Sequence, residues 1–466
     1  MSTLFNAANE TCRTENGAFQ YHTTLSKCLD LFAKVGSCRD EPDVIVPLFR
    51  HAMAEDPNIA LRIMLWSHDV RGGAGERQAF KNMVLEVLKD SDYQIALKRA
   101  ILDKIPELGR WDTLYKVAKD SGDNGLFIYV LEKLVRALHE NNALCAKWLP
   151  RKGEVFNRLR GYLGITPKQL RKLLKEVAGF TVERLMSANQ WDKIVYEHVP
   201  SVAMARYRNA FMRHDPDRFQ AYLDAVRKNE TKINAGVVFP HDVIRNCRTA
   251  PKAAQAQWEN LPNYADTQDN ILCMADVSGS MTVPVSGSVT AMDIALGLAI
   301  YISERNHGPF KDEVILFSRR PSMQKLSGNI YQKMYQLQHV MDPYNTDFIA
   351  ALELILNSAK RFKIPPAEMP TKLLVLSDMQ FDHSLNMTVY REILMRYHEA
   401  GYEVPEIVFW NLNARYTDGQ MVTRDTQGCA LISGYSPVIL KEVLKGKIPT
   451  PYEIMMSTIG GERYKL

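Results

Sequence analysis

Residues 270–281 read NILCMADVSGSM, an apolar run that ends in Asp276 and continues with Ser278 and Ser280. Short runs that are apolar on both faces are typical of buried strands in a parallel sheet. If the chain stays extended beyond Asp276, the three polar side chains point the same way, because side chains alternate along a strand. The stretch therefore poses a choice: one serine is a nucleophile, or all three side chains hold a metal ion.

Similar apolar runs recur in the second half of the chain and alternate with amphipathic segments. The runs are DEVILFS (312–318), TKLLVLSD (371–378), PEIVFWNL (405–412) and GCALISG (428–434). The amphipathic segments cover residues 290–306, 346–362, 387–401 and 436–446. Continuous apolar strands that alternate with helices predict a doubly wound, mostly parallel α/β domain with helices on both faces.

The first half of the chain has a helical pattern instead. Apolar residues recur three and four positions apart in residues 42–56, 57–70, 76–90, 124–141 and 166–179. We predict an all-α helical-repeat (HEAT-like) domain over residues 1–255, with an irregular helical domain as the alternative. Residues 248–270 are rich in Ala, Gln, Asn and Pro and are interpreted as a linker or domain edge, so that the α/β domain covers residues 256–466.

The strand ends of the α/β domain supply a set of oxygen ligands. Two apolar runs end in an acidic residue, Asp276 and Asp378, so both carboxylates fall on the carboxyl edge of one sheet. Thr346, just before a long amphipathic segment, can reach the same edge. Carboxylate and hydroxyl oxygens suit Mg²⁺, Mn²⁺ or Ca²⁺, of which we expect Mg²⁺. Because the hydroxyls are neutral, such an ion would attract an acidic group at an open position.

Asp276-x-Ser278-x-Ser280, followed by Thr346 and Asp378, resembles the metal-ion-dependent adhesion site of von Willebrand factor A domains. The resemblance covers residues from about 268 to about 450. It implies that these five residues bind the metal ion directly or through water. It also implies that an acidic group of a partner completes the coordination shell.

A serine nucleophile is the alternative for the same residues. The nucleophile elbow of α/β-hydrolases needs G-x-S-x-G, but Asp276 stands where the first glycine belongs. His307 and His383 lie in the domain without clear placement beside Ser278. Residues 322–325 match S-x-x-K but lack the motifs that accompany it in β-lactamases. We expect no enzyme activity.

The basic charge of the chain lies in its first half. Residues 1–260 hold 39 Lys and Arg against 31 Asp and Glu, and the remainder holds 19 against 22. The run from residue 145 to residue 175 combines many cations, one acid and the rings of Trp148, Phe156 and Tyr162, which suits RNA. The candidate RNA-binding residues are Arg71, Arg77, Lys147, Arg151, Lys152, Arg158, Arg160, Lys168, Arg171 and Lys172. The alternative is a solvated basic face whose rings pack inward.

Residues 68–80 read HDVRGGAGERQAF, a glycine-rich stretch between Arg71 and Arg77. Backbone amides in such a stretch can approach a phosphate. The Lys-Ser/Thr of a P-loop is absent, so we expect no nucleotide cofactor. A tight turn between two helices is the alternative interpretation.

A helical front half joined to a von Willebrand A-like domain is similar to the TROVE-module, Ro-like ribonucleoproteins. DVRGGAGER (69–77) and the stretch from Trp191 to Phe219 resemble an uncharacterised family of bacterial, phage and plant proteins with the same layout. The resemblance to Ro-like proteins implies small noncoding or structured RNA as a partner.

The remaining features exclude several classes of protein. The seven cysteines are scattered without a C-x-x-C pair, which argues against a zinc site or a disulfide framework and favours a cytoplasmic protein. The N-terminus lacks the apolar region of a signal peptide, and no apolar run approaches the length of a membrane span, so we expect no membrane partner.

The leading prediction is a non-enzymatic, metal-dependent binding protein, an RNA-binding scaffold of the Ro-like type. The alternative is a protein–protein assembly or structural factor, possibly related to phage, that uses the metal site alone to bind an acidic protein group.

Overall fold

The structure is a computed structural model. It describes residues 11–14, 17–39, 41–179, 182–199, 201–227, 239–247, 251–261, 263, 269–286, 289–317, 320–338, 347–381, 387–413, 419–434, 439 and 447–466. The chain forms two compact units. Unit 1 comprises Met1–Ile63 and Ala235–Gly461, and unit 2 comprises Met64–Asn234 and Glu462–Leu466.

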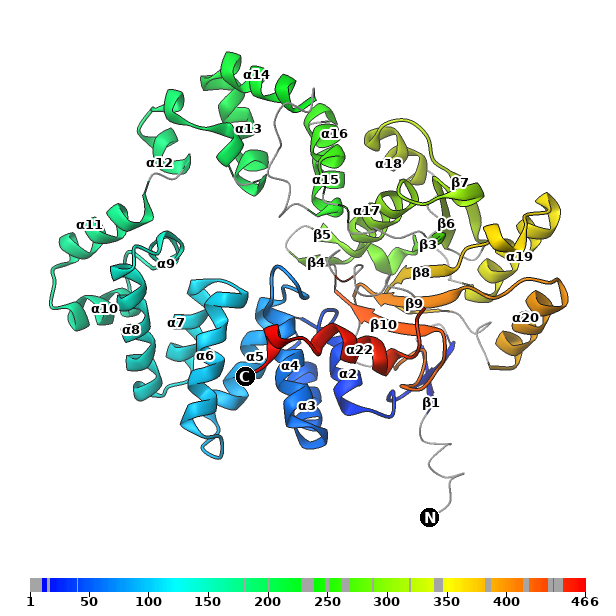
Figure 1. The fold of residues 1–466 in the computed structure, drawn as a ribbon, viewed down its shortest axis with the longest axis horizontal. Coiled ribbons are helices and arrows are strands. Elements are labelled where there is room, and N and C mark those ends of the chain that lie inside the picture. The colour runs from blue at the N-terminus through cyan, green and yellow to red at the C-terminus, as the bar shows by residue number, and fades with distance from the viewer. Residues whose placement is uncertain are drawn as a thin grey trace. The chain divides into compact units, whose positions relative to one another are not determined.

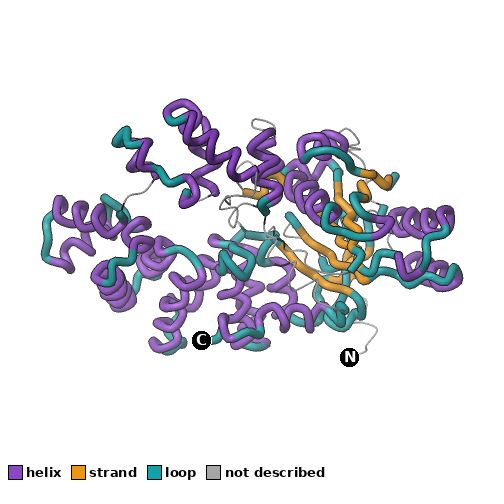
Figure 2. The backbone as a smooth tube through the Cα atoms, turned by 45° about the horizontal axis from the view of Figure 1, so that its top comes forward, coloured by secondary structure: helices purple, strands orange, loops and turns teal. Residues whose placement is uncertain are grey.

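Unit 1 is built on a six-stranded sheet with the order β10-β9-β8-β3-β6-β7. All neighbours in the sheet are parallel except β6 and β7, which are antiparallel. Figure 2 shows these strands running side by side. Their bounds are β3 Ile271–Asp276, β6 Glu313–Phe317, β7 Ser322–Lys325, β8 Lys372–Ser377, β9 Glu406–Asn411 and β10 Cys429–Ser433. The predicted doubly wound, mostly parallel sheet is confirmed, including all five predicted strands.

Helices cover both faces of the sheet because its central strands are apolar on both faces. Alternate residues of the strands, among them Met274, Val375 and Phe409, form a buried core with α19 (Phe348–Phe362) and α20 (Met387–Glu399). The opposite face carries α17 (Ala291–Ser303), whose residues are all buried. Figure 1 shows α19 and α20 beside the strands in yellow and orange. Apart from Ile439, the predicted helix over 436–446 lies outside the described residues.

A helix from before the sheet packs on α17. At the crossing of α15 (Pro240–Cys247) and α17, a Cβ on Gly297 would lie 2.9 Å from the backbone nitrogen of His241. The glycine therefore allows the two helix backbones to approach closely. α18 (Ile330–Gln338) contacts α15 and α17 as well.

Several elements of unit 1 were not predicted, among them a helix and an edge strand of the sheet. Residues 251–259, interpreted as part of a linker, form the helix α16 (Pro251–Glu259), so that interpretation was wrong there. Proline at its first position and the alanines and glutamines that follow favour a helix. The helix is held in place by Trp258, which is buried and donates to Glu304 at 2.6 Å. The second element is the polar edge strand β7, which has no apolar face to reveal it.

The beginning of the chain also belongs to unit 1. The strands β1 (Thr11–Arg13) and β2 (Phe19–Tyr21) form a hairpin, and α2 (Lys27–Lys34) packs on α3 (Pro42–Glu55) and on β10. The two compact units therefore differ from the predicted division into residues 1–255 and 256–466. Helical periodicity identifies helices but does not show which sheet or helix they contact.

Unit 2 is helical throughout its described residues, and its helices pack mainly on near neighbours in sequence, as predicted for a helical-repeat fold. Its elements after α4 (Pro57–His68) are α5 Arg77–Lys89, α6 Ile95–Leu108, α7 Trp111–Asp120, α8 Asn124–His139, α9 Ala143–Trp148, α10 Glu154–Leu163, α11 Pro167–Ala178, α12 Val182–Ser187, η1 Trp191–Lys193, η2 Tyr196–His198, α13 Ser201–His214 and α14 Pro216–Arg227. α11 begins with the capping box that Thr166 and Gln169 form.

None of the helices in the described residues combines the length and the apolar character that crossing a bilayer requires.

His68 gives unit 2 a pH dependence. Its ring is fully buried, stacks on Phe80 with ring centroids 4.2 Å apart, and lies so close to Gly109 that a Cβ there would be 2.2 Å from Nε2. Burial lowers the pKa of His68 to about 4, from an ordinary value of 6.5. The unfolded chain therefore binds a proton more readily than the folded unit between pH 6.5 and pH 4.

We expect the free energy of unfolding of unit 2 to fall by about 2 kcal/mol between pH 7.5 and pH 5 through this group. Denaturant unfolding at both pH values should show that loss in the wild-type protein and a smaller one in His68→Gln, which cannot titrate. Equal pH dependence in the two proteins would contradict the assignment.

Candidate metal site and basic surface

The candidate metal site lies at the point in the sheet where the order of successive strands reverses. From β3 the chain passes to β6 and β7 on one side, and then returns to β8, β9 and β10 on the other. β3 and β8 are therefore neighbours whose connections lead to opposite edges of the sheet. Ligands of open α/β sheets bind at such a switch point, beyond the carboxyl ends of the strands.

The two predicted carboxylates end these two neighbouring strands. Asp276 is the last residue of β3, and Asp378 follows directly on β8. Asp276 is 0% exposed and Asp378 is 3% exposed. Oδ1 of Asp276 accepts from the backbone N–H of Ser278 at 2.9 Å, and Oδ1 of Asp378 accepts from the N–H of Gln380 at 3.3 Å.

The two predicted hydroxyls lie together beside Asp276. Ser278 has an extended backbone, and Ser280 lies in the 3-10 turn η3 (Gly279–Thr282). Their Oγ atoms are 3.1 Å apart. The extended conformation thus ends at Ser278, and a 3-10 turn instead of strand alternation brings the second hydroxyl to the first. Both serines are half-buried, so this side of the site is open to solvent.

The pair of buried carboxylates is electrostatically unfavourable without a cation. Burial raises the pKa of Asp276 well above its ordinary range, and the nearby charge of Asp378 raises it further. Hydrogen bonds from Ser377 and Ser278 act in the opposite direction. A buried carboxylate pair with two adjacent hydroxyls is a donor set that fits a hard divalent cation. Thr346, the fifth predicted ligand, lies outside the described residues.

Sequence reasoning missed Ser377. Its hydroxyl donates to Oδ2 of Asp276 at 2.5 Å and accepts from the N–H of Met379 at 2.9 Å. The signal was present in the sequence, as a hydroxyl residue at the end of the strand TKLLVLSD. Its partner could not be found there, because the bond joins two strands about a hundred residues apart. Ser377 is fully buried and orients the carboxylate of Asp276 through this hydrogen bond.

Of the two histidines considered as partners of Ser278, His307 is the one that lies in the described residues, and it lies away from Ser278. His307 precedes β6 and follows Asn306, whose Oδ1 accepts from the N–H of Ile271 at 2.8 Å, at the start of β3. His307 therefore lies at the amino edge of the sheet, opposite Ser278. His383 lies outside the described residues. Residues 322–325, which match S-x-x-K, form the strand β7, and alternation places Ser322 and Lys325 on opposite faces.

The ten candidate RNA-binding residues all lie in unit 2. Seven are exposed: Arg71, Arg77, Lys147, Lys152, Lys168, Arg171 and Lys172. Three are half-buried: Arg151, Arg158 and Arg160. The predicted basic surface thus includes exposed lysines at α9, at α11 and in the loop between α9 and α10.

Several of these cations have partners within unit 2. Arg151 donates to the carbonyls of Leu149 at 2.5 Å and Ala146 at 3.0 Å, at the end of α9. Arg158 lies 4.0 Å over the ring of Phe127. These arginines stabilise helix packing, so the exposed lysines are the better candidates for a ligand.

The rings of the basic run mostly pack inward. Phe156 is buried. The guanidinium carbon Cζ of Arg110 lies over the ring of Trp148, 3.5 Å from the ring centroid. Tyr162 is 48% exposed. Of the three rings, only Tyr162 is therefore exposed beside the basic side chains, so it is the one ring of this run that is available to stack on a nucleobase.

The glycine-rich stretch is a tight turn around a buried carboxylate. Asp69 is 0% exposed and accepts from Arg463, from Tyr464 Oη at 2.9 Å and from the N–H of Arg71 at 2.9 Å. A Cβ on Gly73 would lie 2.0 Å from the carbonyl oxygen of Trp66. The glycine is thus required by a close approach of backbone to backbone, which supports the turn interpretation over a phosphate loop.

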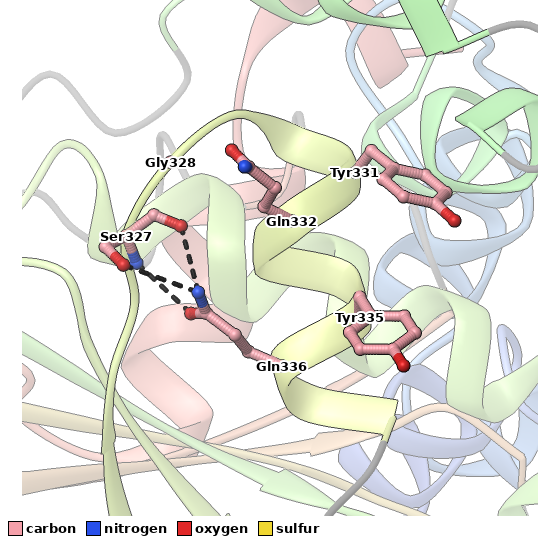
Figure 3. A pocket seen from close by; sticks show the side chains of 6 residues that line it. All are labelled: Ser327, Gly328, Tyr331, Gln332, Tyr335 and Gln336. Carbon is pink, nitrogen blue, oxygen red and sulfur yellow. Dashed lines mark hydrogen bonds between the residues drawn. The ribbon is translucent and has the colours of Figure 1, made fainter.

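A concave region lies on α18 (Figure 3), with a volume of about 440 Å³. Tyr331 and Tyr335 lie on one side of the helix and Gln332 and Gln336 on the other, where Gln336 donates to the carbonyl of Ser327 at 3.1 Å. Among the described residues that line it, none is a carboxylate, an imidazole or a thiol. It offers surface for contact but no acid–base pair.

Two family models match parts of this chain. A family model described as a domain of unknown function (DUF7788) matches residues 270–459, and a second domain of unknown function (DUF2828) matches residues 14–89 and 162–273. The two matches meet at the start of β3. Neither family description states an activity.

Two proteins resemble the chain over nearly its whole length. The uncharacterized protein L728 of Acanthamoeba polyphaga mimivirus is 27% identical over 503 residues, which cover 96% of this chain and 86% of that protein. The crystal structure of the Ro (RSR) protein of Deinococcus radiodurans matches with a TM-score of 0.48 and 13% identity, covering 88% of this chain and 93% of that one.

From the carboxylate pair we predict that the charge of Asp276 destabilises the folded state of the metal-free protein. Replacing it by Asn removes a buried charge next to Asp378. We therefore expect Asp276→Asn to raise the free energy of unfolding of the metal-free protein by about 1–2 kcal/mol at pH 7.5.

The pH dependence has a defined sign. The folded-state pKa of Asp276 lies above its unfolded value, so its destabilising effect is present at neutral pH and disappears as the pH falls. The gain from Asp276→Asn should therefore shrink at pH 5. Denaturant unfolding in chelator measures it, and a variant less stable than wild type at pH 7.5 would contradict the prediction.

Proposed function

We propose that the chain is a non-enzymatic binding protein that holds a divalent cation at Asp276, Ser278, Ser280 and Asp378, with Thr346 as a further ligand. The observation that supports this most directly is the buried carboxylate pair at the switch point of the sheet, beside two half-buried hydroxyls. A pair of this kind is stabilised by a cation and has no evident role in packing.

Mg²⁺ is the proposed ion, with Mn²⁺ and Ca²⁺ as other hard cations that accept oxygen ligands. The bound ion would supply positive charge at a position open to solvent. Since two of the ligands are neutral hydroxyls, it would attract an acidic side chain of a partner protein. Asp276 and Asp378 would hold the ion from the buried side, with Ser377 fixing the orientation of Asp276.

A reducing compartment such as the cytoplasm suits this proposal. All seven cysteines are free thiols, and six of them are buried. Burial raises the pKa of the Cys145 thiol to about 12 and that of Cys247 to about 11, which keeps them protonated and unreactive.

Titration calorimetry with MgCl₂ tests the metal site. We expect one binding event for the wild-type protein and none for Asp378→Ala, whose fold should stay intact by circular dichroism. Glu368→Ala is the matched control, because Glu368 is an exposed carboxylate before the amino end of β8. Wild-type binding that survives in Asp378→Ala would refute the site.

The basic surface of unit 2 supports RNA as a second partner. Lys147, Lys152 and Lys168 are exposed, on or near α9 and α11. Phosphate contacts dominate the affinity of proteins for nucleic acids, so exposed cations on one unit are the expected binding groups. The resemblance of the sequence to Ro-like ribonucleoproteins points in the same direction. We propose small structured or noncoding RNA as the ligand, bound independently of the metal ion.

Filter binding with a structured RNA and a single-stranded RNA at 50 and 200 mM salt tests this second function. Changing the three lysines to Glu should lower affinity at least tenfold at 50 mM salt and flatten the salt dependence. The matched control changes Lys360, Arg361 and Lys363, three exposed cations of α19 and its C-cap. Negligible binding of the wild-type protein at 50 mM salt would leave the acidic protein partner as the remaining candidate.

A further inference from the structure

The N-terminal segment, defined as the described residues 11–14 and 17–39, lies along the carboxyl edge of the sheet. The backbones of Tyr21 and Gln420 exchange two hydrogen bonds, of 2.8 and 2.7 Å. Further on, the N–H of Gly36 donates to Oγ of Ser433, the last residue of β10, at 3.0 Å. Figure 1 shows α2, in blue, beside β10. The segment therefore contacts the edge that carries the metal site, although nearly the whole length of unit 1 separates them in sequence.

Two buried side chains of the segment hold the loop that follows Asp378. Oγ1 of Thr14 donates to the carbonyl of Phe381 at 2.6 Å, and Nε2 of Gln20 donates to the carbonyl of Met379 at 3.4 Å. Gln20 is 0% exposed and Thr14 is 6% exposed. These bonds replace water that the loop carbonyls would otherwise need.

Each of the two side chains is itself fixed from a second side. Oγ1 of Thr14 accepts from the N–H of Ala18 at 2.8 Å, and Oε1 of Gln20 accepts from the N–H of Gly419 at 3.0 Å. Because each side chain both donates and accepts, its orientation is determined. They can therefore position the loop and not merely fill space beside it.

The loop needs such support because its backbone is not in a relaxed conformation. Met379, next to Asp378, has a φ of 66°, in the left-handed region that non-glycine residues rarely adopt. Residues in that region persist where the surrounding structure fixes them. The contacts that fix this one are its N–H on Ser377 and its carbonyl on Gln20.

The same segment also contacts the short strand β4 (Pro284–Ser286), which follows the η3 turn that contains Ser280. Nη1 of the buried Arg39 donates to the carbonyl of Val285 at 3.0 Å, and Nη2 donates to the carbonyl of Gly36. Gly36 is seated so closely that a Cβ would lie 2.6 Å from the backbone nitrogen of Gly434. One segment thus contacts both the 378–381 loop and the strand that follows the turn of the two serines.

We propose that the N-terminal segment is a positioning element of the metal site: Thr14 and Gln20 set the placement of Asp378, and Arg39 stabilises the strand β4 that follows Ser278 and Ser280. The inference rests on the proposed metal function. Thr14 and Gln20 do not touch the ion. They act through the 378–381 loop, so the affinity of the site for Mg²⁺ depends on residues more than 350 positions away in sequence.

The test compares Thr14→Val with Thr14→Ser in the full-length chain. Valine keeps the volume and removes the hydroxyl, whereas serine restores the bond to Phe381. Thr24→Val is the matched control, because Thr24 is a fully buried threonine of the same segment whose hydroxyl donates locally to the carbonyl of Ser26 at 2.9 Å. Each protein is first checked for a wild-type circular dichroism spectrum.

Two measurements are made on each protein. Hydrogen exchange of residues 377–381 in chelator reads the loop without the metal, and MgCl₂ calorimetry reads the site. We expect Thr14→Val to speed exchange in this loop and to weaken Mg²⁺ binding about tenfold, while Thr14→Ser and Thr24→Val stay near wild type.

The outcomes separate the two proposals. If the wild-type protein binds no Mg²⁺, the proposed metal function fails, and the exchange measurement still decides whether Thr14 holds the loop. If the wild-type protein binds Mg²⁺ and Thr14→Val binds it equally well with unchanged exchange, the positioning role is wrong and the metal function stands. Equal losses in Thr14→Val and Thr24→Val would also overturn the inference, since they would reflect general destabilisation.

Discussion

The parallel pairing of β3 with β8 is the constraint on which the site of this protein depends. It brings the ends of two strands together at the switch point of the sheet and thereby places Asp276 and Asp378 in one buried position. Two buried carboxylates repel each other and lose their hydration, so the arrangement costs free energy that the fold must supply elsewhere. The apolar sheet core on both faces supplies it, and Ser377 and the backbone amides at the strand ends reduce the cost.

Much of this arrangement could be predicted from the sequence because it follows from local patterns. Five strands were predicted, since each is a short run that is buried on both faces. The edge strand β7 was missed because its residues, SMQK, have no apolar face. The helix α16 was interpreted as part of a linker because its composition was weighed instead of its helix propensity, and the buried contact of Trp258 with Glu304 that holds it is tertiary.

The candidate site was predictable to the extent that its ligands lie at strand ends. Asp276 and Asp378 fall where the strand pattern placed them, but the contact of Ser377 with Asp276 crosses between strands and leaves no local trace. The basic run shows the opposite difficulty. Its cations and rings are evident in the sequence. The burial of Phe156 and the contact of Arg110 with Trp148 could not be predicted from the spacing of these residues.

The residues that form and support the candidate metal site therefore come from both ends of the chain. Periodicity assigns residues 11–39 to a helical front half, whereas their hydrogen bonds assign them to the edge of the sheet. A fragment that begins at the first strand of the sheet would contain the two aspartates and the two serines. It would lack Thr14 and Gln20, whose side chains hold the loop after Asp378, where Met379 has a left-handed backbone conformation. For a metal ion that demands near-octahedral geometry, the ligands alone are not sufficient, because the support that fixes their positions comes from the other end of the chain.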